Sequence, residues 1–326
     1  MKEKQLQKFK PDYRNLFQKH LVLVLIGLLI LVTIIVEPKF FTLGNFTNIM
    51  RQFGPLIMLA MGMTFVIIGG FIDLSVAGIM SLTAVITLSL IEPLGQVPAL
   101  IAGLLIGTAA GFLNSLIMLS SGALTQAEGL FISYGMSIVY GGTALLYTGG
   151  VTKHMSYITV NYSLFTAIGT GTVGVFSVSF LIFLGFLAIL YIFQNKTYMG
   201  RAISLVGGNK VAARLAGVPI GKSIMMIYTI SGFMAAAGAI VLFSRVTTAS
   251  PVLGRGFDLN AILAVVVGGT SLSGGKGNVL RTVVGTMLVI LLANCMNLLG
   301  VTVYMQNVMK GLILMLAIWL DSRKGI

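Results

Sequence analysis

Residues 223–243 have the sequence SIMMIYTISGFMAAAGAIVLF, which contains no charged side chain. A helix of this length and polarity spans the ~30 Å hydrocarbon core of a bilayer. Similar apolar runs lie at 21–36, 53–70, 75–91, 97–119, 129–148, 173–193, 259–269, 282–299 and 305–320, and the run at 259–269 is the shortest. The sequence therefore predicts an all-α, polytopic membrane protein with about ten transmembrane helices.

The composition excludes a water-soluble fold. Of the 326 residues, 57% are hydrophobic and only 9% are charged, whereas about 25% of the residues in an ordinary soluble domain are charged. The mean hydropathy is +1.00. No stretch free of apolar runs is long enough to form a separate soluble domain, so we expect one membrane domain at 21–320.

The charged residues are distributed unevenly along the chain. The net charge of +13 arises from 21 Lys and Arg against 8 Asp and Glu. Basic residues gather in the segments 1–20 and 194–222 and in the tail 321–326. With about ten crossings, the positive-inside rule places all three segments, and both termini, in the cytoplasm. This placement favours contact with anionic membrane lipid or a cytoplasmic protein over binding of nucleic acid.

Chemistry on a substrate is not indicated by the sequence. The chain has two histidines and one cysteine, and its eight acidic residues are scattered, without a metal-ligand spacing or a nucleophile elbow. Residues 216–223, AGVPIGKS, approximate a nucleotide-binding loop with Ala in place of the first Gly. Such a loop needs a preceding strand, whereas the flanking residues here predict helices. We therefore expect no enzyme activity, no metal and no cofactor in this chain.

Polar residues beside the apolar runs are candidates for a solute path. Asp73 lies between the runs 53–70 and 75–91, where a carboxylate is costly unless it is paired or lines a cavity. It is either a pathway or gating residue or, as we favour, a helix cap within Asp73-Leu74-Ser75 that accepts backbone N–H groups. Asn114 lies within a run and can hydrogen-bond either another helix or a polar solute.

The loop at 194–222 is the most informative polar segment. Residues 210–215 are predicted to form a short helix between Gly207-Gly208-Asn209 and Gly217-Val218-Pro219. A short helix between two membrane spans could bind a cytoplasmic protein or lie against anionic lipid headgroups. Further along, the stretches 69–75 (GGFIDLS) and 268–275 (GGTSLSGG) resemble each other, and each is expected to follow a helix that runs towards the cytoplasm.

These features resemble the permease subunits of bacterial ATP-binding-cassette importers of the ribose and monosaccharide type, within the branched-chain amino acid/ribose permease superfamily. The resemblance covers about residues 40–320. Four motifs carry it in the order found in the family: LAMGMT at 59–64, GFIDLSV at 70–76, GR at 200–201 with GGN at 207–209 and AARLAG at 212–217, and VGGTSLSGGKG at 267–277.

The resemblance implies a subunit in the bacterial inner membrane that pairs with an identical or homologous permease around a translocation path. It also implies two partner types, a cytoplasmic ATPase subunit and an extracytoplasmic solute-binding protein. The residues implied for ATPase coupling are Gly200, Arg201, Asn209, Ala212, Ala213, Arg214 and Gly217. Those implied for the path or its gating are Asp73, Ser75 and Asn114, and a cytoplasmic glycine-rich loop would contain Gly268, Gly269, Thr270, Ser273, Gly274 and Gly275.

The chain departs from the family pattern at three places. Ala77 separates Val76 from Gly78, the motif at 254–261 reads GRGFDLNA with one acid fewer, and Glu128-Gly129 stands where a proline is usual. The transported sugar and the choice between a homodimer and a heterodimer therefore stay open. The alternative function is an ion-coupled secondary transporter of a small polar solute, for which Asp73 is the candidate ion-binding residue.

Overall fold

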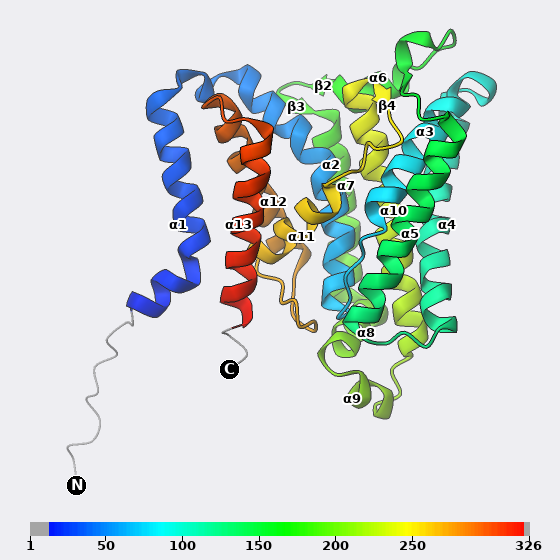
Figure 1. The fold of residues 1–326 in the computed structure, drawn as a ribbon, viewed down its shortest axis with the longest axis vertical. Helices are drawn as coiled ribbons and strands as arrows, with labels where there is room; N and C mark the ends of the chain where they lie inside the picture. Colours follow the sequence, from blue (N-terminus) through cyan, green and yellow to red (C-terminus); the bar gives the residue numbers. More distant parts are fainter. Residues whose placement is uncertain (1–12, 323–326) are drawn as a thin grey trace.

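The computed structural model of the chain describes the backbone of residues 13–322 and the side chains of residue 24 and residues 26–319. Most of the predicted basic segment 1–20 and of the predicted tail 321–326 lies outside these described residues. The described part is almost entirely helical, as the apolar runs predict (Figure 1).

The longer helices are α1 (Tyr13–Val36), α2 (Leu43–Ile68), α3 (Val76–Leu94), α4 (Gln96–Ser120), α5 (Gln126–Thr148), α7 (Val178–Lys196), α10 (Ile220–Val246), α12 (Val279–Leu298) and α13 (Val303–Ser322). The shorter ones are η1 (Pro38–Phe41), η2 (Met155–Tyr157), α6 (Ser163–Thr170), α8 (Tyr198–Gly208), α9 (Lys210–Leu215) and α11 (Phe257–Val267). Two antiparallel strand pairs complete the fold, β1 (Lys153–His154) with β4 (Thr248–Ala249) and β2 (Thr172–Val173) with β3 (Phe176–Ser177).

Each of the ten predicted apolar runs coincides with a helix. Within the described residues, seven helices are long and apolar enough to cross a membrane, and Ile26–Val36, Phe257–Val267 and Val303–Trp319 are shorter apolar segments. An all-α, polytopic membrane protein is therefore confirmed, whereas ten crossings stay a prediction. The helices α6 and α8 were not predicted, since neither is a long apolar run.

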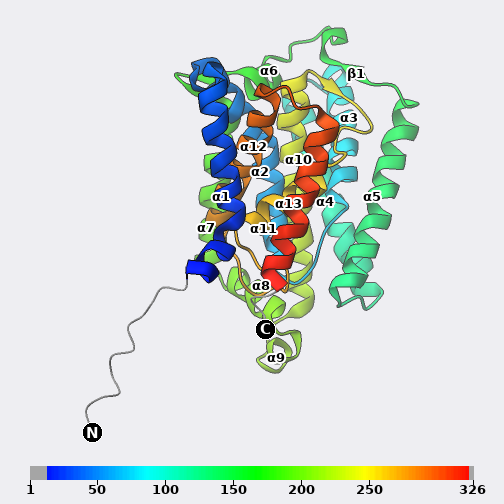
Figure 2. The ribbon, with the colours of Figure 1, turned by 60° about the vertical axis from the view of Figure 1, so that its left-hand side comes forward.

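The helices form a bundle with two distinct ends (Figures 1 and 2). The first described turn of α1, the last turn of α13, and α8 and α9 share one end, here called the α9 end. The strand pairs and α6 cover the opposite end. The described ends of α1 and α13 thus lie at the same end of the bundle as α8 and α9, whereas the placement of both termini and of the 194–222 segment in the cytoplasm stays a prediction.

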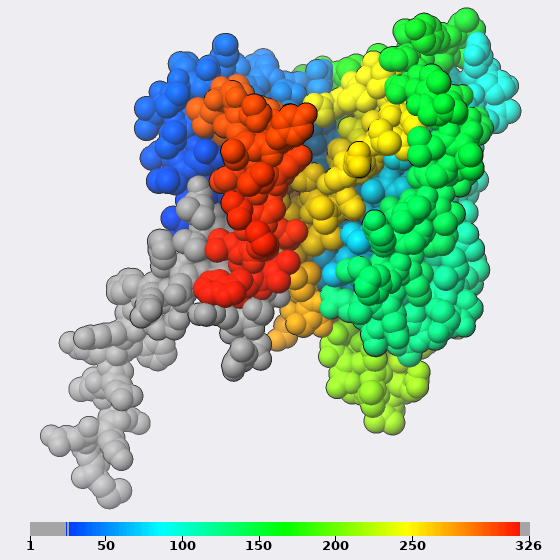
Figure 3. Space-filling model, viewed as in Figure 1, coloured from blue at the N-terminus to red at the C-terminus, as the bar shows by residue number. Residues whose placement is uncertain are grey.

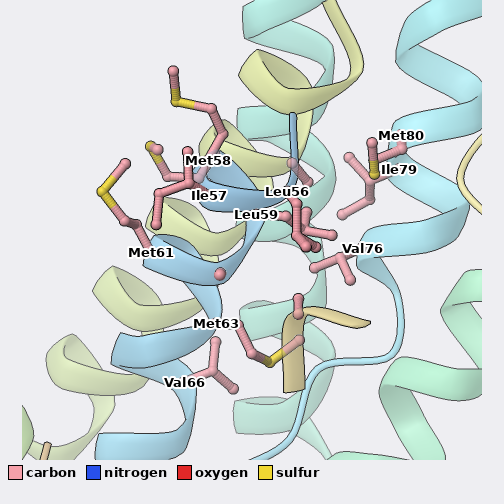
Figure 4. Packing of buried hydrophobic residues seen from close by; sticks show 14 of the residues in the cluster. Leu56, Ile57, Met58, Leu59, Met61, Met63, Val66, Val76, Ile79 and Met80 are labelled. Atoms are coloured by element: carbon pink, nitrogen blue, oxygen red, sulfur yellow. The ribbon is translucent and has the colours of Figure 1, made fainter. Parts of the chain in front are cut away.

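The core of the bundle is built on α2 and α10, which are buried over most of their length. Leu56 and Leu59 of α2 lie close to Val76 of α3, whereas Met58 and Met61 point to the opposite side of α2 (Figure 4). Glycines bring α4 and α10 into backbone contact, because a Cβ on Gly232 would lie 2.8 Å from the Cα of Gly111. Close approach of this kind stabilises helix pairs where lipid offers no hydrophobic driving force.

Candidate functional site

Asp73 lies in the non-helical segment 71–75, which connects the end of α2 to the start of α3 inside the bundle. Its carboxylate has no exposed surface. Oδ1 accepts the backbone N–H of Ser75 at 3.0 Å and the Ser75 hydroxyl at 2.5 Å, and Oδ2 accepts the Ser231 hydroxyl of α10 at 2.7 Å. The carboxylate thus bonds to the backbone of Ser75, the residue that precedes α3, and it also connects this segment to α10. The choice between a helix cap and a pathway residue stays a prediction.

The hydrogen bonds continue from Ser75 into two more helices. Asn114 of α4 donates through Nδ2 to the Ser75 hydroxyl oxygen at 2.7 Å. The Tyr140 hydroxyl of α5 lies 2.9 Å from Asn114 Oδ1 and 2.9 Å from the Ala110 carbonyl oxygen. The polar network thus joins α3, α4, α5 and α10, and it brings together the three residues predicted for the path, Asp73, Ser75 and Asn114.

Three residues that hold this region were not predicted as site residues. Ser231 and Tyr140 complete the network, and Ser133 of α5 fixes the backbone of segment 71–75. The Ser133 hydroxyl accepts the Leu74 N–H at 3.1 Å and lies 3.2 Å from the Ile72 carbonyl oxygen. A single hydroxyl in an apolar run carries no signal that distinguishes a network member from a hydroxyl bonded to its own helix, so sequence reasoning could not select them.

The segment predicted to couple to an ATPase, here called the coupling segment, consists of α8 and α9. The predicted short helix at 210–215 is confirmed with the same bounds. Asn209 caps its start, because its Oδ1 accepts the Ala212 N–H at 3.0 Å, and Gly217 ends it with a left-handed φ of 72°. Gly200 allows α8 to turn back against α7, since a Cβ there would lie 2.7 Å from the Cα of Gln194.

Helix α9 projects from the end of the bundle (Figures 1 and 3). Its surface includes the predicted residues Ala212 and Arg214, and Arg201 of α8 is also exposed, whereas Ala213 is buried against the protein. Val211 and Leu215 are 71% and 85% exposed. These two aliphatic residues were missed, although their spacing of four places them on one side of the helix.

The glycine-rich loop at 268–275 repeats the local structure that follows α2. After α2, Phe71 N–H bonds to the Val66 carbonyl and Gly70 N–H to the Ile67 carbonyl. After α11, Thr270 N–H bonds to Val265 and Gly269 N–H to Val266 in the same way. Gly70 and Gly269 have φ values of 79° and 87°, which favour glycine. Both similar stretches therefore end a helix with a Schellman motif.

Five glycines meet at the α9 end of the bundle, and we call Gly70, Gly207, Gly208, Gly274 and Gly275 the glycine junction. The Gly275 N–H donates to the Ile68 carbonyl oxygen at 2.8 Å. A Cβ on Gly274 would lie 2.9 Å from Gly70 Cα and 2.6 Å from the Gly207 carbonyl oxygen. The coupling segment, the end of α2 and the glycine-rich loop are thus in backbone contact, although they lie far apart in sequence.

Side chains reinforce the same loop. Gln194 of α7 donates to the Gly277 carbonyl and accepts the Val279 N–H, both at 3.0 Å, and Gln126 donates to the Leu272 carbonyl at 3.1 Å. Of the other residues predicted here, Thr270 is buried, Ser273 is exposed, and a Cβ on Gly268 would lie 2.6 Å from the Arg281 carbonyl oxygen. No group of three His, Cys, Asp or Glu side chains that could hold a metal occurs among the described residues.

A family described as the permease component of branched-chain amino acid transport systems matches residues 45–318. The matched residues include the ends of α2 and α11 and the coupling segment. The chain belongs to this family. It is thus a membrane permease component, and the helix ends described above lie within the matched residues.

Several relatives match this permease over nearly its whole length. The ribose import permease protein of Escherichia coli K12 is 34% identical over 304 residues, covering 92% of this chain and 93% of the relative. The ribose import permease protein of Bacillus subtilis 168 is also 34% identical, with 92% of each chain covered. The galactose/methyl galactoside import permease protein of Escherichia coli K12 is 32% identical, covering 92% of this chain and 94% of the relative. No solved structure matches the permease.

Proposed function

We propose that this permease is the membrane subunit of an ATP-driven importer and forms the path for a monosaccharide or a sugar-like solute. The observation that carries the proposal is the projecting helix α9, whose exposed Val211 and Leu215 form an apolar surface at the end of a membrane bundle. Its relatives are named as ribose and galactose/methyl galactoside import permeases, which supports a sugar as the solute.

A separate ATPase subunit docks on α8 and α9 in this proposal. Exposed aliphatic residues on a projecting helix are poorly placed in water and well placed in a protein interface. Arg201 and Arg214 are exposed beside them and can pair with acidic side chains of the partner. The α9 end then faces the cytoplasm of a bacterial cell, in agreement with the positive charge of residues 194–222.

The solute follows a path between two permease subunits in this proposal, and a solute-binding protein delivers it at the opposite end of the bundle. No chemistry acts on the solute, and ATP-driven movement of α9 changes which end of the path is open. Asp73, Ser75 and Asn114 are fully buried in this conformation. They either hold the start of α3, α4 and α10 together beside the path or line the path when these helices separate.

The proposal is tested by co-expressing the permease with the ATPase and binding-protein genes that neighbour its own gene. The complex is purified by a tag on the permease and reconstituted in nanodiscs. D-ribose or D-galactose, presented with the binding protein, should stimulate ATP hydrolysis. Absence of any co-purified ATPase, together with uptake that collapses with the proton gradient, would establish the ion-coupled alternative instead.

Docking on α9 has its own test. Arg214→Glu should weaken co-purification of the ATPase and leave membrane insertion of the permease intact. Arg281→Glu is the matched control, because Arg281 is also exposed near the glycine-rich loop but lies on α12. Equal co-purification of the two variants would remove Arg214 from the docking surface.

A further inference from the structure

Lys210, the first residue of α9, contacts the bundle and not only solvent. Its ammonium nitrogen lies 3.9 Å from the centroid of the Phe71 ring. The same nitrogen donates to the Leu124 carbonyl oxygen, in the turn between α4 and α5. Partial burial lowers the pKa of Lys210, and the nearby Glu128 carboxylate opposes that shift. Lys210 therefore connects α9 to two segments that are distant from it in sequence.

Phe71 is the part of segment 71–75 that faces Lys210. The ring is fully buried and its centroid lies 6.1 Å from that of Tyr228 on α10. A Cβ on Gly129 of α5 would lie 2.9 Å from Phe71 Cδ1, so the ring is confined on that side too. Asp73 follows two residues later and is held by Ser75 and Ser231. A displacement of Phe71 must therefore displace the segment that carries Asp73.

We propose that Lys210 is a positioning residue that transmits the movement of α9 to segment 71–75 and hence to the Asp73 network. The inference rests on the proposed docking of an ATPase at α9. The glycine junction joins α8 to the end of α2 through backbone contacts, and Lys210 adds a side-chain connection one residue beyond α8's cap. When α9 moves, the ammonium group draws the Phe71 ring and the Leu124 turn with it.

The chemistry of the contact defines the variants. Attraction to the face of an aromatic ring needs a cation, and the carbonyl contact needs a donor. Lys210→Arg supplies both and should retain the connection. Lys210→Met keeps an unbranched apolar stem but removes the charge and the donor. Lys222→Met is the matched control, because Lys222 is an exposed lysine at the start of α10.

The first measurement uses the purified permease alone in lipid nanodiscs. Hydrogen exchange of the amides in 71–75 should become about tenfold faster in Lys210→Met, since one desolvated cation–π contact and one hydrogen bond are lost. Exchange in Lys210→Arg and Lys222→Met should match that of the unaltered chain. Phe71→Leu should accelerate exchange as Lys210→Met does, and the double variant should add little further. Unchanged exchange in Lys210→Met would overturn the proposal.

The second measurement uses the permease with its ATPase and binding protein, and D-ribose and D-galactose as probes. Lys210→Met should reduce solute uptake per ATP hydrolysed, whereas Lys210→Arg should restore it. If exchange in 71–75 rises but uptake per ATP is unchanged, Lys210 has only a structural role and the proposal is wrong. Failure to co-purify an ATPase refutes the proposed function instead, and the exchange measurement reports on the Lys210 connection in either case.

Discussion

Gly207→Ala should destabilise the permease, whereas Gly208→Ala should not. A Cβ on Gly207 would press against the Ile68 carbonyl group and lie 2.9 Å from the Gly275 nitrogen, within a backbone hydrogen bond of the glycine junction. A Cβ on Gly208 would meet only the Gly275 Cα, at 3.8 Å, which is an ordinary contact. Both glycines lie in the last turn of α8, so the two variants differ in the space around the new methyl group.

The expected change in the free energy of unfolding follows from two opposing effects. Overpacking a tight site costs about 1–3 kcal/mol, and the upper part of this range applies where the obstacle is backbone that cannot change rotamer. Alanine in a helix is favoured over glycine by up to about 1 kcal/mol, and less in a last turn. Gly207→Ala should therefore cost about 2 kcal/mol, and Gly208→Ala should be neutral or slightly stabilising.

The assay is the fraction of permease that stays monodisperse after heating in detergent, measured by size-exclusion chromatography of a fluorescently tagged chain. Gly207→Ala should lower the midpoint temperature by several degrees relative to Gly208→Ala at equal expression. Equal midpoints would show that the backbones at the glycine junction do not approach as closely as described. The reasoning about the glycine junction would then be wrong.

Three further predictions concern other parts of the site. Asp73→Ala should lower the heating midpoint in the same assay by more than Asp73→Asn, because alanine leaves the Ser75 N–H and the Ser231 hydroxyl unpaired at about 1–3 kcal/mol each. Equal midpoints for the two variants would contradict the hydrogen bonds assigned to the Asp73 carboxylate. Tyr228→Phe should be neutral or stabilising, since the Tyr228 hydroxyl is buried without a hydrogen-bond partner among the described residues; a large loss of stability would show a missed partner. Leu215→Ser should reduce ATPase co-purification more than Leu280→Ser, an equally polar change at an exposed position of α12, and leave the midpoint unchanged; equal binding would place the interface elsewhere.

The membrane fold could be predicted from the sequence because each span must hide its backbone groups within its own helix. The run 223–243, for example, lies wholly within α10, and even the short run at 259–269 lies close to α11. The helix at 210–215 was equally accessible, since Asn209 and Gly217 are local start and stop signals. Helix α8 also begins at a capping residue, because the Thr197 hydroxyl accepts the Gly200 N–H at 3.1 Å, but the packing of Gly200 and Ile203 against the bundle was not visible in the sequence.

For the candidate site, too, local features could be predicted from the sequence and long-range contacts could not. The sequence alone predicted a membrane protein and the short helix at 210–215, because these depend on local composition and order, and its motifs carried the resemblance to the permease family. Only the tertiary structure decided that Asp73 bonds to Ser231, that Lys210 reaches Phe71, and that Gly70, Gly207 and Gly274 meet. Such contacts join segments that are more than sixty residues apart, and their partners are selected by how the helices pack and not by any local preference.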